Sequence, residues 1–116
     1  MARLQPKEPG IGPSRAAELV AGGALLIDVR EAKEWVAGHP PVAVHVPVGF
    51  VVDEMVNFPR DRQIIVVCRS GRRSAAVTDQ LLQSGFDAVN LDGGVVAWIE
   101  AGLPFETDDG GAGKVA

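Results

Sequence analysis

Two apolar runs, each followed by polar residues, constrain the fold of this chain more than any other feature. Residues 24–29 read Ala-Leu-Leu-Ile-Asp-Val, and residues 64–67 read Ile-Ile-Val-Val. A nearly continuous apolar strand is typical of a sheet that is covered on both faces, because neither row of side chains then meets water. The two runs therefore predict buried strands at the centre of an α/β fold.

Helical patterns alternate with such strands along the chain. We expect strands over residues 24–29, 42–46, 63–67 and 88–91, with a further short candidate near Ile11. We expect helices over residues 13–21, 31–37, 50–58, 74–84 and 94–101, each followed by glycine or proline. This alternation predicts a compact α/β domain with a mostly parallel central sheet and helices on both faces.

The length of 116 residues indicates one domain. Residues 1–10 are polar and carry two prolines, so we interpret them as a flexible lead-in to a folded domain over residues 11–105. Residues 106–116 contain four charged side chains, three glycines and little that is apolar, and we expect a disordered tail there.

Composition excludes several partners. The formal net charge of −4 disfavours a nucleic-acid surface, and no apolar stretch approaches the roughly 20 residues of a membrane span. A single cysteine and no apolar leader favour a reducing, cytoplasmic setting. One cysteine and two histidines predict no metal site, and the usual glycine-rich nucleotide motifs are missing, so we expect no cofactor.

Cys68 lies where a nucleophile is expected, directly after the second apolar run. The residues that follow it, Arg69-Ser70-Gly71-Arg72-Arg73, form a basic loop before a helix. Backbone N–H groups at a helix start and nearby arginines both favour a thiolate over a thiol. A lone cysteine is more often a small buried apolar residue, but this position predicts an anion-binding site around a reactive sulfur. Arg30 leaves the first strand at the same edge of the sheet, either as a substrate contact or in an ion pair with Asp28 or Glu34.

Four motifs in order resemble the rhodanese (sulfurtransferase) family over roughly residues 11–105. They are Leu-Ile-Asp-Val-Arg-Glu at 26–31, Glu-Trp-Val-Ala-Gly-His at 34–39, Cys-Arg-Ser-Gly-Arg-Arg-Ser at 68–74 and Asn-Leu-Asp-Gly-Gly at 90–94. One segment departs from the pattern: residues 38–43 read Gly-His-Pro-Pro-Val-Ala where relatives usually read Gly-His-Ile-Pro-Gly-Ala.

The resemblance implies an enzyme of the thiosulfate sulfurtransferase type. Cys68 would carry a persulfide, and residues 69–73, with Arg30, would bind a small anionic donor such as thiosulfate. The acceptor would be cyanide or a thiol, including the thiol of a protein. The alternatives are a non-enzymatic or relay module that binds a protein partner and carries persulfide sulfur, and, less favoured, a cysteine phosphatase. A phosphatase of this loop type would need a histidine where Val67 stands and an arginine where Ser74 stands.

Overall fold

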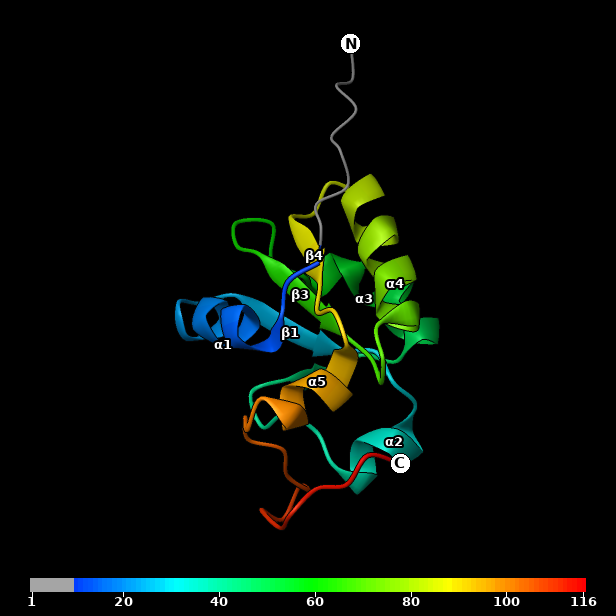
Figure 1. Ribbon diagram of the computed structural model, residues 1–116. Coiled ribbons are helices and arrows are strands. Elements are labelled where there is room, and N and C mark those ends of the chain that lie inside the picture. Colours follow the sequence, from blue (N-terminus) through cyan, green and yellow to red (C-terminus); the bar gives the residue numbers. More distant parts are fainter. Residues whose placement is uncertain (1–9) are drawn as a thin grey trace.

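Four short parallel strands form one sheet, in the order β2-β1-β3-β4, in this computed structural model, which describes residues 10–116 (Figure 1). The strands are β1 (Leu25–Asp28), β2 (Val44–His45), β3 (Ile64–Val67) and β4 (Ala88–Asn90). Asp28 at the end of β1 pairs with Val67 at the end of β3. The carboxyl ends of the two central strands therefore lie side by side, and the predicted sheet of parallel strands is confirmed.

Helices cover both faces of this sheet. Side chains point alternately to opposite faces of a strand, so Ile64 and Val66 join one core cluster while Ile65 and Val67 join the other. The first cluster packs under α3 (Val51–Glu54) and α4 (Arg72–Gln83), and the second under α1 (Pro13–Ala21) and α5 (Gly94–Glu100). A short helix, α2 (Ala32–Ala37), follows β1. All four residues of β3 are fully buried, as the apolar run predicts.

Two predicted helices have different bounds in the structure. The helix after the basic loop begins at Arg72 rather than at Ser74, because Gly71 caps it in a left-handed conformation with φ of 111°. Residues 48–57 form a 3-10 turn (η1, Val48–Phe50), the one-turn helix α3 and a second 3-10 turn (η2, Met55–Asn57) instead of one helix. Such 3-10 turns are frequent at the ends of short helices.

The segment with the unusual prolines still makes a turn into β2, closed by the Ala43 N–H, which donates to the Pro40 carbonyl at 3.0 Å. The candidate strand near Ile11 appears as a single parallel bridge to Leu91. Of the expected lead-in, residues 1–9 lie outside the described residues. Within residues 10–116, no helix combines the length and the apolar character needed to cross a membrane.

Residues 106–116 differ from the expected disordered tail, because they fold back along the domain. Glu106 and His39 exchange two backbone hydrogen bonds of 2.9 Å, and the Lys114 N–H donates to the Ala37 carbonyl at 2.8 Å. Val115 packs against the second core cluster. Composition did not predict this because backbone hydrogen bonds, which any sequence can make, hold much of the segment.

We predict that a chain ending at Phe105 is less stable by about 1–3 kcal/mol, because each lost hydrogen bond contributes about 1 kcal/mol. Urea unfolding measures this difference. A chain ending at Ala112 keeps the Glu106 bridge but lacks Lys114 and Val115, and should show an intermediate loss. Equal unfolding midpoints for all three chains would mean that the segment adds no stability.

Candidate functional site

Cys68 follows β3 directly, and its sulfur is surrounded by hydrogen-bond donors. The Sγ atom accepts from the Gly71 N–H at 3.1 Å, the Ser74 N–H at 3.4 Å and the Ser74 hydroxyl at 3.2 Å. Ser74 lies in the first turn of α4, where backbone N–H groups have no partner within the helix. The loop therefore turns otherwise unpaired donors toward one sulfur atom.

These donors set the acidity of the thiol. Cys68 is only 1% exposed, and this burial raises the pKa of its thiol. Hydrogen bonds from the Ser74 hydroxyl and from the backbone N–H groups of Ser74, Gly71 and Ser70 lower that pKa by more, so it lies below its ordinary value. A lowered pKa increases the fraction of nucleophilic thiolate at neutral pH. The sequence predicted the N–H groups, but it missed Ser74 as a side-chain donor.

The loop keeps its shape because the start of α5 packs against it. The Val95 N–H donates to the Cys68 carbonyl at 2.8 Å, and Asn90 Nδ2 donates to the Gly71 carbonyl at 3.3 Å. Gly94 has φ of 61°, and a Cβ there would lie 2.3 Å from the Arg69 carbonyl oxygen. No larger residue fits without moving the loop. The paired glycines at 93 and 94 are the sequence signal for this close approach.

The predicted loop arginines have different surroundings. Arg73 donates to both carboxylate oxygens of Glu34, at 2.7 and 3.0 Å, and this bond lowers the pKa of Glu34 to about 2. The same hydrogen bond, followed by the negative charge of Glu34 and then that of the Cys68 thiolate, raises the pKa of Arg73. Arg69 and Arg72 are exposed, as is Ser70. Two cationic side chains are thus exposed, of which Arg69 also donates from Nε to the Ala116 backbone oxygen at 3.4 Å, and the third is held by Glu34.

Arg30 is the exception among the candidate substrate-binding residues, because its side chain is fully buried. Its Nε and Nη2 atoms donate to the Asp28 carboxylate at 3.0 and 2.8 Å, and Nη2 also donates to the Gly38 carbonyl at 2.8 Å. The sequence left substrate contact and an ion pair as alternatives. The structure supports the ion pair, with Asp28 as the partner, and this guanidinium has no exposed surface for a ligand.

The two histidines pack in an aromatic stack, as expected of structural residues. Trp35 lies parallel to His39 and His45, with ring centroids 3.5 and 4.7 Å away. His39 Nε2 lies 2.7 Å from an Asp108 oxygen, and His45 Nε2 lies 2.7 Å from the Arg30 carbonyl. Among the described residues, no cluster of three histidine, cysteine or acidic side chains could hold a metal ion.

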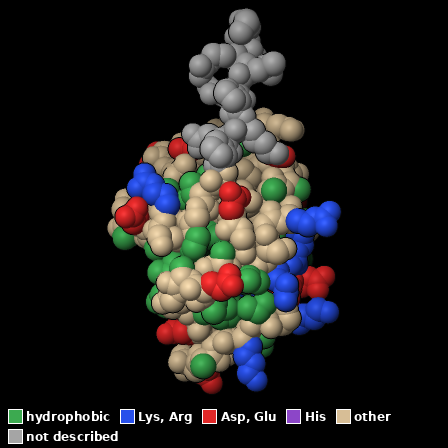
Figure 2. All heavy atoms as spheres, in the orientation of Figure 1, with side chains coloured by type: hydrophobic (Ala, Val, Ile, Leu, Met, Phe, Trp, Pro, Cys, Tyr) green, Lys and Arg blue, Asp and Glu red, His purple; other side chains and the backbone are tan. Residues whose placement is uncertain are grey.

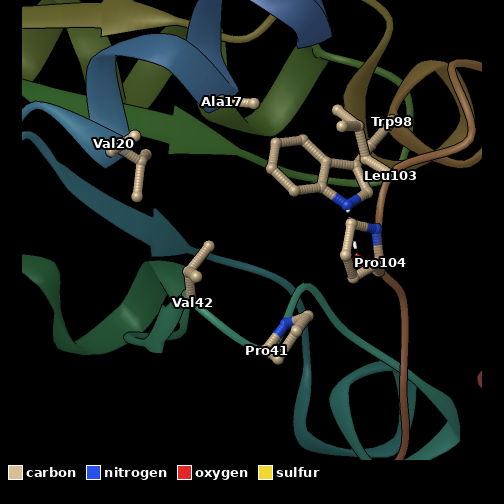
Figure 3. A pocket seen from close by; sticks show the side chains of 8 residues that line it. Ala17, Val20, Pro41, Val42, Trp98, Leu103 and Pro104 are labelled. Carbon is tan, nitrogen blue, oxygen red and sulfur yellow. Dashed lines mark hydrogen bonds between the residues drawn. The ribbon is translucent and has the colours of Figure 1, made fainter.

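An apolar pocket of about 250 Å³ lies elsewhere, between α1, α5 and the loop before β2 (Figure 3). Its walls include Ala17 and Val20 of α1, Val42 of the loop and Trp98 of α5. The Trp98 Nε1–H already donates to the Pro104 carbonyl at 2.7 Å. Figure 2 shows the hydrophobic area over α1 and α5, while many of the visible Lys and Arg side chains gather along the edge where Figure 1 draws α4. None of the residues that line this pocket belongs to the Cys68 loop, so the pocket and the Cys68 site are separate.

We predict that Ser74→Ala raises the pKa of Cys68, because the variant loses the hydroxyl hydrogen bond that stabilises the thiolate. The pH dependence of alkylation by iodoacetamide measures this pKa. Ser70→Ala is the matched control, since its hydroxyl is exposed and its backbone N–H remains. Identical alkylation profiles for Ser74→Ala and wild type would contradict the role given to the hydroxyl.

Comparison with known proteins shows the family to which this chain belongs. The family model described as the rhodanese-like domain matches residues 13–101. A sulfurtransferase of Allochromatium vinosum is 38% identical over 87 residues, which cover 74% of this chain and 81% of that protein. The thiosulfate sulfurtransferase GlpE of Pseudomonas savastanoi is 35% identical over 86% of this chain and 94% of its own length. A crystal structure of a rhodanese-related protein from Thermoplasma volcanium superposes with a TM-score of 0.78 at 30% identity, over 84% of this chain and 97% of that one. The chain therefore belongs to the rhodanese-like domain family.

Proposed function

We propose that this protein is a sulfurtransferase that moves a sulfane sulfur from thiosulfate to a thiophilic acceptor through a persulfide on Cys68. Relatives named sulfurtransferases support this type of enzyme in general. One observation carries the finer proposal: three donors from Gly71 and Ser74 converge on a single buried sulfur. The same donors that stabilise a thiolate would stabilise the negative sulfur of a persulfide.

The proposed reaction has two balanced steps. In the first, the Cys68 thiolate attacks the outer sulfur of thiosulfate, a new S–S bond forms, and the S–S bond of thiosulfate breaks as sulfite leaves with the electron pair. In the second, cyanide or a thiolate attacks the outer sulfur of the persulfide. The Cys68 thiolate leaves with the electron pair, and thiocyanate or a new persulfide is released. No external oxidant or reductant is needed.

The loop arginines would recruit the dianionic donor. Arg69 and Arg72 are exposed beside the Cys68 loop of a chain whose net charge is −4. A local cationic edge on an acidic protein attracts small anions to that edge. Arg73, held by Glu34, would add a fixed positive charge near the sulfur. Arg30 has no part in this proposal, because it is buried against Asp28.

The other functions considered fit the site less well. A cysteine phosphatase needs an arginine clamp at the position of Ser74, and the Ser74 hydroxyl instead donates to the sulfur. A module without enzymatic activity would have no need of the intact cysteine and its donors. A relay that passes persulfide sulfur to a protein remains part of the proposal, as does the cytoplasmic setting that the single cysteine favours.

We predict that Cys68→Ser abolishes formation of thiocyanate from thiosulfate and cyanide, because a serine hydroxyl is not ionised at neutral pH and forms no persulfide. The fold should persist, since the exchange changes little volume; circular dichroism provides the control. A serine variant that turns over at a rate comparable to wild type would overturn the assignment of Cys68.

We predict that Arg69→Ala and Arg72→Ala each raise KM for thiosulfate about two- to fivefold at low salt, with little change in kcat, because exposed charges contribute up to about 1 kcal/mol. The effect should shrink as salt is added, since charges are screened within about 10 Å at 0.1 M. Arg15→Ala is the control, because Arg15 pairs with Glu18 on α1. Unchanged KM in both loop variants would show that these arginines are only a solvated edge.

A further inference from the structure

The helical segment 48–57, which comprises η1, α3 and η2, begins beside the strand end that carries Cys68. The Val48 N–H donates to the Val29 carbonyl at 3.1 Å, and the Val29 N–H donates to the Val67 carbonyl at 3.0 Å. Val67 immediately precedes Cys68. Neighbouring strands are about 4.8 Å apart, so the start of the segment lies about 10 Å from the chain at Cys68.

The inner face of this segment belongs to the core under the active-site loop. Val51 is fully buried and shares a core cluster with Cys68. Met55 and Phe58 pack partly buried against the same cluster. Val51 and Met55 are four residues apart and both face this core, and Phe58 follows directly after the end of η2. The segment is therefore firmly seated, and its other side is directed outward.

The outer face of the segment is also apolar. Val48, Phe50, Val52 and Val56 are 45%, 60%, 59% and 85% exposed. They are four of the nine large apolar side chains exposed within residues 10–116. A surface helix normally directs polar residues to solvent, and this segment instead exposes four large apolar side chains beside the polar Asp53 and Asn57. Scattered exposed apolar residues are ordinary, but a group beside a reactive site marks an interaction surface.

We propose that these four residues, the docking surface, bind a protein that carries the acceptor thiol. This inference rests on the sulfur transfer proposed above. Small anions such as thiosulfate and cyanide gain no binding energy from apolar side chains. A protein thiol flanked by apolar side chains does gain binding energy from them. Because Cys68 is 1% exposed, its acceptor must approach through the loop, where the exposed Arg69 and Arg72 also lie.

The charged residues near Cys68 and on the docking segment indicate which charges the partner protein should carry. Arg69 and Arg72 favour acidic residues on the partner near the reacting thiol. The docking segment itself carries the exposed Asp53, so a negative charge over that helix would be repelled. The partner that fits is a protein with a thiol next to acidic residues on one side and apolar residues on the other. Burial of its apolar side chains against Val52 and Val56 would supply the affinity.

The test uses protein loaded with sulfur by thiosulfate and then freed of sulfite. Two short synthetic peptides serve as acceptors, each with one cysteine and two aspartates; in one the cysteine is next to leucine and phenylalanine, and in the other next to serine and glutamine. Mass spectrometry of the peptide persulfide gives kcat/KM. We expect wild type to prefer the apolar peptide about tenfold, and the double variant Val52→Ser with Val56→Ser to lose most of this preference.

Three controls keep the outcomes distinct. Ile99→Ser, an exposed apolar residue of α5 on the other face of the sheet, should retain the preference. Transfer to cyanide should be unchanged in the double variant. If the double variant melts at a lower temperature than wild type, the single variant Phe50→Ser replaces it and should also reduce the preference for the apolar peptide. Equal rates for the two peptides with wild type would overturn the docking surface while leaving sulfur transfer intact.

Failure of the protein to take up sulfur from thiosulfate would instead refute the proposed function. Sedimentation velocity tests whether a second copy of this chain binds the docking surface instead. If wild type is a dimer and the double variant is a monomer, a second copy of the chain covers the docking surface, and the proposal of an acceptor protein is wrong.

Discussion

The convergence of hydrogen-bond donors on the sulfur of Cys68 is the interaction on which the rest of the site depends. A buried thiol would ordinarily be less acidic, because desolvation disfavours its charged form. Here the left-handed Gly71 and the first turn of α4 bring N–H groups to the sulfur, and the Ser74 hydroxyl adds a third donor. The low-polarity surroundings then strengthen these bonds. The Cys68 sulfur is thus both buried and more acidic than an ordinary thiol. The proposed persulfide chemistry requires both properties.

A buried charge pair fixes the short helix α2 beside the end of β1. The Arg30 guanidinium binds Asp28 of β1 and the Gly38 carbonyl that follows α2, so it ties that helix to the end of the central strand. Glu34 of α2 in turn holds Arg73 of α4. Breaking a buried pair costs about 3–5 kcal/mol because an uncompensated charge remains. The two ion pairs therefore link α2 to β1 on one side and to α4 on the other.

Much of the fold follows from the sequence, since runs such as 64–67 are typical of strands buried on both faces, and the structure buries all four residues. The position of Cys68 after such a strand likewise predicted its place at the sheet edge. The sequence did not separate the roles of the arginines, because their partners, Glu34 and Asp28, depend on how α2 packs. It did not reveal Ser74 as a side-chain donor. The direction of the Ser74 hydroxyl depends on its place in the first turn of α4, and the sequence predicted a later start for that helix. The fold of residues 106–116 was missed because backbone hydrogen bonds leave little trace in composition.

The intact mass of the protein after incubation with thiosulfate tests the central claim most directly. The account predicts that wild type gains the mass of one sulfur atom, that a thiol reductant removes it, and that peptide mapping places it on Cys68. The Cys68→Ser variant should gain nothing under the same conditions. A wild-type mass that does not change, or an added sulfur that persists in the serine variant, would contradict the persulfide assigned to Cys68.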